Sequence, residues 1–306
     1  MCISSRLFSL SIFSSLLLSA CGQTRQSVSR PAIVQGQPVE AQEFPVVSLL
    51  KKDSGGVEFS YCTGVLVSPK HVLTAAHCSL DAKGQVYEAK SVHVVWGENL
   101  PESKLDVALR VRALHPHPSY DSNQMGKDAE GVIKPGKAHD IAVWELEDAA
   151  KASAKIAAVI DLNSAEEFLK ASGQVQLLGF GAKDGFASPW EAHPLLAAQT
   201  SYGPVMSVDV RRQEMIGGRL VTHTVHLDLP AYSETEFFAG GKDQPDTCKG
   251  DSGGPVMVSR SNGEHLLLGL TSRGSSQCDR GGVYTLVPAY GDWLKAQGVP
   301  LQTQTY

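Results

Sequence analysis

Two features that would point to particular functions are missing from this 306-residue sequence: an excess of positive charge and a long apolar run. The 27 lysines and arginines are outnumbered by 32 aspartates and glutamates, so the net charge is −5 at pH 7. A chain of this charge shows no electrostatic signature of nucleic-acid binding, and no such partner is expected. The clearest apolar stretch, residues 7–18, has about twelve residues and is too short to cross a bilayer.

Long stretches with helical periodicity are also scarce. Glycine (29 residues) and proline (16 residues) are frequent, and turn residues separate many short apolar runs. This pattern favours an all-β fold of about a dozen short strands. The predicted strands are 44–50, 64–67, 71–73, 91–96, 107–114, 141–146, 174–179, 206–210, 220–229, 255–258, 266–271 and 282–287, with short helices at 164–170 and 288–297. The polar segment 121–139 has little core potential and is expected to be a solvated loop.

Residues 1–20 are predicted to be a signal peptide. Arg6 precedes the apolar core, and residues 18–21 (LSAC) follow it. This short pattern resembles the lipobox of bacterial lipoproteins, in which cleavage leaves the cysteine first and its sulfur receives a lipid. The alternative is an ordinary small-residue cleavage site that precedes a cysteine. We favour lipidation of Cys21, because the pattern lies at the end of the apolar core, and Gly22 then suggests the outer membrane.

The six cysteines divide into two groups. Cys2 is removed with the signal peptide and Cys21 is committed to the lipid. Four cysteines remain in an exported chain, at positions 62, 78, 248 and 278, and they predict two disulfides. The sequence alone permits three pairings. Residues 21–32 are polar and are predicted to form a flexible tether or propeptide.

Three short motifs carry residues suited to nucleophilic catalysis. Ser252 is flanked by glycine in Lys249–Pro255 (KGDSGGP), where a tight turn can expose its hydroxyl beside backbone N–H groups. A neutral serine needs a base to take its proton. Thr74–Cys78 (TAAHC) supplies His77 at the end of an apolar strand, and Asp140, in HDIAV, supplies a carboxylate that can orient the imidazole.

In this order, TAAHC, DIAV and GDSGGP resemble the trypsin/chymotrypsin-like serine proteases. The resemblance extends from Ile33 to Leu294. It implies a protease domain over residues 33–306 with two six-stranded antiparallel β-barrels, a catalytic cleft between them and a short C-terminal helix. The barrels are expected to join near residues 147–172.

The resemblance also implies the role of each site residue. Ser252 is the expected nucleophile of a serine endopeptidase, His77 the general base and then acid, and Asp140 the residue that orients His77. The N–H groups of Gly250 and Ser252 are expected to form the oxyanion hole. Ser272 matches the serine that supports the triad aspartate. No cofactor is expected.

The same alignment pairs the four cysteines. Cys62 and Cys78 are expected to form a disulfide beside His77, and Cys248 and Cys278 to tie the walls of the specificity pocket. Phe238 stands where many relatives have a cysteine, so that loop is expected to be held by packing.

The resemblance further predicts cleavage after Arg or Lys. Asp246 matches the pocket-floor aspartate of trypsin-like members, and Gly274 and Gly282 match the glycines of the pocket wall. A buried carboxylate there would bind a basic side chain through charge-assisted hydrogen bonds. The alternative is that Asp246 caps a surface turn, with Asp243 as the competing candidate. Arg273, where the family usually has an aromatic residue, is expected near the pocket mouth.

A metal site is not expected. His115 and His117, and likewise His223 and His226, have ligand-like spacings, but on strands residues three apart face opposite sides. The calcium loop of the family is not evident either, although Glu98 could match one ligand.

Ile33 begins the sequence Ile-Val-Gln-Gly, and the family resemblance gives it a role in activation. Cleavage before Ile33 would release an ammonium that pairs with Asp251. Ala32 precedes the cut and Arg30 is followed by Pro31, so self-activation is not expected. Cleavage by a second protease that prefers small residues, or trimming from the tether, is expected instead. The alternative is a chain that stays anchored as a weak or dormant zymogen. The anchored lipoprotein is expected at the outer membrane, on the periplasmic side or the cell surface. The same cut would separate the protease domain from a lipid on Cys21, so activation would also be release.

The expected partners are protein or peptide substrates and an activating protease, with membrane contact only through the lipid on Cys21. Two other interpretations compete with an active protease. A catalytically silent homologue would serve as a binding or adhesion module. An α/β esterase would need the order Ser, Asp, His, whereas the order here is His, Asp, Ser.

Overall fold

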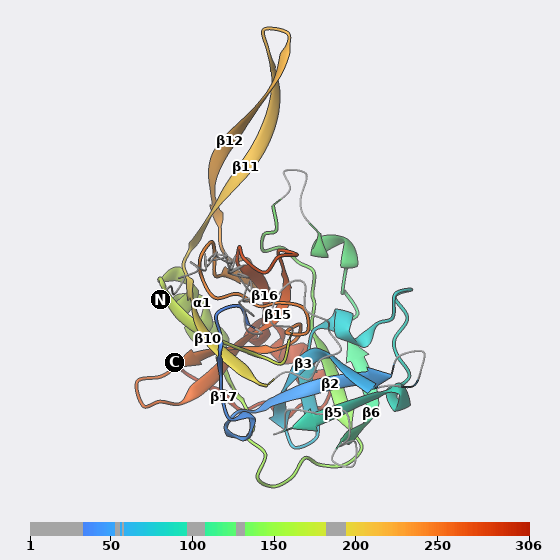
Figure 1. Ribbon diagram of the computed structural model, residues 1–306. Coiled ribbons are helices and arrows are strands. Elements are labelled where there is room, and N and C mark those ends of the chain that lie inside the picture. The colour runs from blue at the N-terminus through green and yellow to red at the C-terminus, as the bar shows by residue number, and fades with distance from the viewer. Residues whose placement is uncertain (1–32, 53–55, 57, 97–107, 127–131, 182–193) are drawn as a thin grey trace, which may run out of the picture.

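The computed structural model describes residues 33–52, 56, 58–96, 108–126, 132–181 and 194–306. The predicted signal peptide, Cys21, the tether and Glu98 lie outside these residues. The described chain forms two closed antiparallel β-barrels of six strands each, which lie side by side (Figure 1). The prediction of a two-barrel, all-β fold is therefore confirmed.

The first barrel has the strand order β2-β3-β4-β7-β6-β5. Its strands are β2 (Val46–Lys52), β3 (Glu58–Ser68), β4 (His71–Thr74), β5 (Val92–Trp96), β6 (Leu109–Pro116) and β7 (Ala142–Leu146). Leu49, Leu66 and Trp144 lie fully buried in one apolar cluster inside it. A Cβ atom at Gly64 would lie 2.6 Å from the Val72 side chain, so this glycine permits the close approach of β3 and β4.

The second barrel has the order β9-β10-β13-β16-β15-β14 and closes because β14 pairs with both β15 and β9. Its strands are β9 (Gly173–Gly179), β10 (Leu196–Tyr202), β13 (Glu236–Ala239), β14 (Pro255–Ser259), β15 (His265–Gly274) and β16 (Gly282–Leu286). Three short strands extend the sheet: β1 (Gln37–Pro38) pairs with β10, while β8 (Ala158–Ile160) runs parallel to both β15 and β17 (Thr303–Gln304).

One apolar cluster joins the two barrels. It includes Val65 and Ile141 from the first half together with Leu178 and Leu267 from the second, all buried. Leu294 of the C-terminal helix packs into the same cluster with no exposed surface. Burial of apolar surface is the main favourable term in folding, so this shared core holds the barrels in a fixed relation.

The helices are few and short. The α-helices are α1 (Leu162–Lys170) and α2 (Gly291–Ala296), and the 3-10 turns are η1 (Ala41–Glu43), η2 (Ala76–Ser79), η3 (Ala89–Ser91), η5 (Ser122–Met125) and η6 (Val287–Tyr290). Asp161 caps α1 by accepting the Ser164 N–H at 3.0 Å. Within the described residues, none of the helices has both the length and the apolarity required to cross a bilayer.

A long two-stranded hairpin leaves the second barrel. It consists of β11 (Val205–Ile216) and β12 (Arg219–Pro230), and it projects away from both barrels at the top of Figure 1. Both strands extend beyond their predicted bounds. Gly217 and Gly218 have φ angles of 57° and 78°, which suit a tight two-residue turn, and every residue of β11 then pairs with one of β12.

Two expectations for loops are wrong. Phe238 lies in strand β13 rather than in a loop. In the segment 121–139, Val132 and Ala138 are buried, and the N–H groups of Gly136 and Ala138 both donate to the carboxylate of Glu236. The segment's own composition is polar, but its partner lies about one hundred residues further along the chain, where sequence patterns do not reveal it.

Candidate active site

Asp140 and His77 form the centre of the site. Asp140 precedes β7, His77 lies in η2 directly after β4, and β4 pairs with β7. The Nδ1 atom of His77 lies 2.9 Å from Oδ2 of Asp140, and the backbone N–H of His77 donates to Oδ1 at 3.0 Å. The two contacts fix the ring, and when Nδ1 carries the proton, Nε2 is left as the basic nitrogen.

The Asp140 carboxylate is fully buried and accepts a third hydrogen bond, from the Ser272 hydroxyl at 2.7 Å. The backbone carbonyl of Asp140 accepts a hydrogen bond from the Thr285 hydroxyl at 2.9 Å. Burial opposes the charge of Asp140, but the nearby His77 and these donors outweigh it, so the pKa of Asp140 lies below its usual value. Partial burial acts to lower the pKa of His77, but the charge and hydrogen bond of Asp140 raise it overall above its usual value.

Ser252 lies against β3, the strand that pairs with β4, and His77 follows β4. The Thr63 N–H of β3 donates to the Ser252 carbonyl at 2.8 Å, and the Cys78 sulfur lies 3.6 Å from the same oxygen. Gly253 follows with a φ of 77°, and a Cβ atom there would overlap the Thr74 hydroxyl. The glycine therefore permits the close approach that places the Ser252 turn beside η2.

The backbone around Ser252 includes the two N–H groups predicted to form the oxyanion hole, those of Gly250 and Ser252. Gly250 has a φ of 96°, a region that favours glycine, and its carbonyl is turned to accept the Thr63 hydroxyl at 2.8 Å. Among the backbone hydrogen bonds of the described residues, neither the Gly250 nor the Ser252 N–H acts as a donor. Both groups remain available to a developing oxyanion.

Two disulfides frame this arrangement. Cys62 pairs with Cys78, which adjoins His77, and Cys248 pairs with Cys278. Of the three pairings that the sequence permits, the structure has the one that the family resemblance implies.

The comparison with known proteins agrees with this geometry. The sequence matches the trypsin family over residues 33–294. The chain belongs to the trypsin family. Human kallikrein-2 is 31% identical over 252 residues, which cover 78% of this chain and 80% of the kallikrein. Human kallikrein-8 is 29% identical over 239 residues (76% and 75%), and the CLIP domain-containing serine protease B4 of Anopheles gambiae is 26% identical over 285 residues (86% and 69%).

The residues predicted to determine the specificity of this trypsin-family chain lie close together. Asp246 is fully buried, and its carboxylate accepts the N–H groups of Thr247 at 2.8 Å and Gly281 at 2.9 Å. Gly274 and Gly282 pair directly across β15 and β16. The alternative of a surface turn is wrong, because Asp246 is buried while Asp243 is exposed. Burial raises the pKa of Asp246 to about 6, against the effect of its N–H donors.

The sequence predicts a cation near the pocket mouth at Arg273, but the structure buries its side chain. Its side chain is only 6% exposed and forms two hydrogen bonds of 2.8 Å with the carboxylate of Glu236. Its guanidinium also donates to the Lys134 carbonyl at 2.9 Å and lies 3.4 Å from the Ser272 hydroxyl. Arg273 is therefore a buried structural cation that clamps the segment before Asp140 onto the second barrel.

Ile33 and Asp251 lie in direct contact. Ile33 is fully buried, and its backbone N–H donates to the Asp251 carboxylate, which also accepts the N–H groups of Gly181 and Cys248 at 2.8 Å. The next residue, Val34, donates its N–H to the Asp246 carbonyl at 2.8 Å. Burial raises the pKa of Asp251 to about 7, despite these donors.

The histidines with metal-like spacing have other neighbours. His117 stacks on His139 with ring centroids 5.1 Å apart and contacts Trp293 edge-on. His226 pairs with Asp209 at 3.0 Å on the hairpin. Within the described chain, the only group of three possible metal ligands in close proximity is Cys62, His77 and Cys78, and its two sulfurs are joined in a disulfide.

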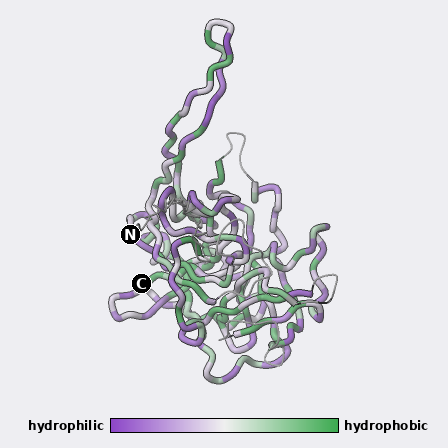
Figure 2. The backbone as a smooth tube through the Cα atoms, viewed as in Figure 1, coloured by the Kyte–Doolittle hydropathy of each residue, from purple (hydrophilic) through white to green (hydrophobic). Residues whose placement is uncertain are grey.

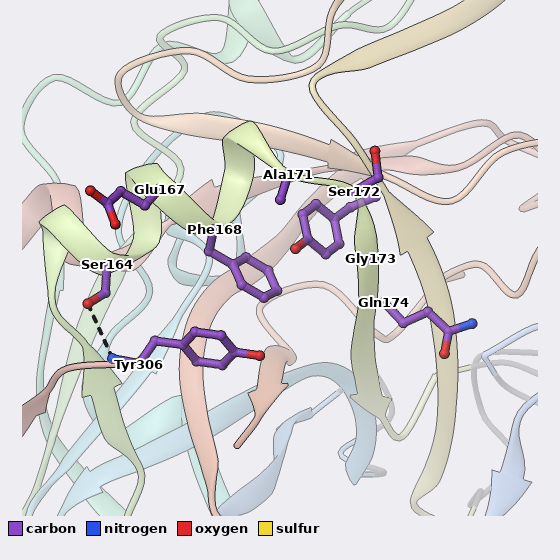
Figure 3. Close-up of a pocket in the computed structure, with 9 residues that line it drawn as sticks. Ser164, Glu167, Phe168, Ala171, Ser172, Gly173, Gln174 and Tyr306 are labelled. Carbon is purple, nitrogen blue, oxygen red and sulfur yellow. Dashed lines mark hydrogen bonds between the residues drawn. The ribbon is translucent and has the colours of Figure 1, made fainter. Parts of the chain in front are cut away.

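A separate pocket lies between α1, β9, β10 and the C-terminus (Figure 3). Phe168 stacks on Tyr202 with centroids 4.4 Å apart and meets Tyr306 edge-on at 5.0 Å. The Tyr306 N–H donates to the Ser164 hydroxyl, as drawn in Figure 3. None of the residues predicted for catalysis lines this pocket.

Sequence reasoning missed several supporting residues. Thr63 binds the Ser252 turn from the first barrel, Glu236 holds the segment before Asp140, and Thr285 anchors the Asp140 carbonyl. A Cβ atom at Gly181 would lie 2.6 Å from the Asp251 backbone nitrogen. The Gly-Phe-Gly sequence at 179–181 was the one available signal, because glycines at a strand end often mark a close backbone approach.

Proposed function

We propose that the chain is a secreted serine endopeptidase in which Ser252, His77 and Asp140 carry out acyl transfer. The observation that carries the proposal is the pair of contacts between Asp140 and His77. The turn of Ser252 lies next to them and is hydrogen-bonded to Thr63 of β3. Membership of the trypsin family supports it. The full set of catalytic residues argues against a silent binding module.

The proposed reaction has two halves. His77 Nε2 takes the Ser252 proton as the hydroxyl attacks the peptide carbonyl, and the Gly250 and Ser252 N–H groups stabilise the oxyanion. His77 then returns the proton to the leaving amine, which leaves an acyl-enzyme on Ser252. Water attacks the acyl group with His77 again as base. The ester bond then breaks, the carboxylic acid product leaves, and His77 returns the proton to the Ser252 oxygen. Asp140 stabilises the imidazolium in each half.

The proposed specificity is for Arg or Lys before the cut. Asp246 lies in the segment that leads to Ser252, and its buried carboxylate accepts the N–H of Gly281, which directly precedes β16. A buried carboxylate in this position favours a basic substrate side chain, and the paired Gly274 and Gly282 leave room along the wall.

The proposed activation is cleavage before Ile33 by a second protease. In the intact chain the Ile33 nitrogen that faces Asp251 is an amide, and Ile33 has a φ of 40°, an unfavourable value for a β-branched residue. Such strain costs about 1–3 kcal/mol. Cleavage removes the preceding carbonyl that defines φ, relieves the strain, and places a charged ammonium against the Asp251 carboxylate.

The proposed location follows from the N-terminal sequence. Residues 1–20 direct export, Cys21 receives a lipid in the outer membrane, and residues 21–32 form the tether. Cleavage before Ile33 then releases the protease domain as it activates it.

The test is active-site labelling together with substrate preference. The protein that begins at Ile33 is treated with a labelled fluorophosphonate, with Ser252→Ala as the control, and is assayed on matched Arg and Phe peptides. We expect labelling at Ser252 and faster cleavage after Arg, a preference that Asp246→Ser abolishes. No labelling would favour a binding module, and faster cleavage after Phe would remove the specificity proposal. Mass analysis of active protein from cells identifies its first residue, and an active species that begins at Cys21 contradicts the coupling of release to activation.

A further inference from the structure

Within the described chain, the outer half of the β11–β12 hairpin contributes no buried residue to the protease fold. The last buried side chain along β11 is Val210, opposite Val225, and every residue from 211 to 224 is exposed. At about 3.4 Å per residue, six strand residues carry the turn about 20 Å beyond that pair. Figure 1 shows this part of the hairpin standing clear of both barrels.

Apolar side chains gather at the turn. Met215, Ile216, Leu220 and Val221 have 62%, 55%, 61% and 38% of their surface exposed. They account for four of the eight large hydrophobic residues that are exposed in the described chain. Figure 2 shows the apolar residues of the distal hairpin on both sides of its turn. Exposed apolar residues in such a cluster mark an interaction site.

The apolar residues surround the turn rather than cover one face. Met215 pairs with Leu220, so both point to one face of the ribbon, whereas Ile216 and Val221 point to the other. A binding groove would need an apolar surface on one side only. A tip that is apolar on both faces suits insertion into a medium that surrounds it.

The charge next to this tip is opposite to that of the whole chain. Residues 211–224 contain three arginines, at positions 211, 212 and 219, and one acidic residue, Glu214, for a net charge of +2. The chain as a whole carries −5. Arg211 lies behind the apolar residues, and Arg219 lies beside the turn, opposite Ile216. Long arginine side chains at these positions can reach lipid phosphates while the apolar residues enter the acyl boundary. Each such cation near an anionic surface contributes attraction that salt weakens.

We propose that the hairpin tip, Met215–Val221, is a membrane-contact element that inserts into a bilayer surface containing anionic lipids. Two strand pairs and a turn reach about 5–10 Å, the depth at which interfacial segments sit. A second copy of the chain fits less well, because a stable protein interface buries about 800 Å² on each partner, more than a seven-residue tip offers. The proposal is independent of catalysis and of a lipid on Cys21, and it would keep the released protease at the membrane.

The test is vesicle sedimentation of residues 33–306, which contain all the described elements and no site for an acyl chain at Cys21. Vesicles are either phosphatidylcholine alone or contain about one third phosphatidylglycerol. We expect the protein to bind the anionic vesicles about tenfold more tightly, with weaker binding at high salt. Ile216→Ser with Leu220→Ser should reduce this binding about tenfold, whereas Val86→Ser with Leu162→Ser, at exposed apolar sites elsewhere, should leave it unchanged.

A second pair of variants tests the charge. Arg211→Gln with Arg219→Gln should remove the preference for anionic vesicles, while Lys151→Gln with Lys170→Gln should preserve it. Circular dichroism verifies that each variant is folded. Equal binding of the parent and the Ile216→Ser/Leu220→Ser variant would overturn the proposal. So would dimerisation without vesicles, measured by light scattering, that the same variant abolishes, since the tip would then bind a second copy.

Discussion

Arg273 and Glu236 form a buried ion pair, with two parallel hydrogen bonds of 2.8 Å between guanidinium and carboxylate. The same carboxylate accepts the N–H of Gly136, and the same guanidinium donates to the Lys134 carbonyl. The pair therefore fastens the segment that leads to Asp140, and it adjoins Ser272, which donates to the Asp140 carboxylate. Its position predicts that the pair supports both stability and catalysis.

Glu236→Gln should destabilise the protein by about 3–5 kcal/mol, because it leaves the Arg273 charge buried without a counter-charge. Replacement of both residues, Glu236→Met with Arg273→Met, should cost less than the single change, because no buried charge remains and only the neutral N–H groups of Gly136 and Ala138 lose their acceptor. Urea unfolding of the three proteins measures the difference. A single variant as stable as the parent would show that the pair contributes little.

The pH dependence of cleavage should follow His77. The pKa of His77 is raised above its ordinary value of 6.5, so the imidazole protonates as the pH falls through a value higher than 6.5. The base is then lost and kcat/KM should fall on the acid side, with a plateau above the pKa. The pH profile of peptide hydrolysis measures this.

Ser272→Ala removes one of the donors that hold the Asp140 carboxylate, and it should lower kcat/KM while the Arg-over-Phe preference stays unchanged. A loss of that preference in Ser272→Ala would instead indicate direct contact with substrate.

Two glycines with similar backbone angles should respond differently to alanine. Gly253 has a φ of 77° and a Cβ atom there would meet Thr74 and Thr63, whereas Gly263 has a φ of 82° and no atom within 4 Å. Gly263→Ala should cost only the backbone penalty of about 1–2 kcal/mol and leave kcat unchanged. Gly253→Ala should cost more and reduce kcat strongly, because it moves the Ser252 turn from β4. Thermal unfolding and peptide hydrolysis compare the two variants, and equal effects would contradict the packing argument.

The stability of the intact chain should fall as the pH rises. The pKa of Asp251 is raised to about 7 in the folded intact chain, whereas an unfolded aspartate has a value of about 4. Between these values the folded state holds the additional proton, so the contribution of Asp251 to the free energy of unfolding decreases with rising pH and is constant above about 7. Cleavage before Ile33 supplies a cation and should reduce this decrease.

Asp251→Asn tests that argument, because its effect on stability should differ between the intact and the cleaved chain. In the intact chain it should lessen the loss of stability between about pH 4 and pH 7. In the chain that begins at Ile33 it should destabilise by about 3–5 kcal/mol, because the ammonium then lacks its partner. Equal effects of Asp251→Asn in both forms would show that the Ile33 nitrogen carries no charge beside Asp251.

Much of the candidate site could be predicted from the sequence, because the proposed catalysis restricts the residues around each side chain. Ser252 needs glycines around it, His77 follows a buried strand and Asp140 precedes one, and these constraints lie within short motifs. Strand positions were also predictable, but for another reason: burial within a barrel imposes apolar runs between turns. The pairing of the four cysteines into two disulfides followed from the family resemblance and not from their spacing.

Other features depend on residues that are distant in the chain. Glu236 in an otherwise apolar strand gave no sign that it would bind Arg273, 37 residues away, or Gly136, 100 residues away. The polar middle of the hairpin is held as strand by pairing across Gly217-Gly218, because each strand supplies the partners that the other lacks.

The local sequence of this chain was enough to predict its strand-rich architecture and to nominate Ser252 as the proposed nucleophile and His77 as the proposed base, since each depends on neighbours within a few residues. The fate of Arg273, the anchoring of residues 132–138 and the exposure of the hairpin tip were settled by the packing of the two barrels. Burial forces each charged or polar group to find a partner, and only the folded chain determines which distant residue is close enough to be that partner.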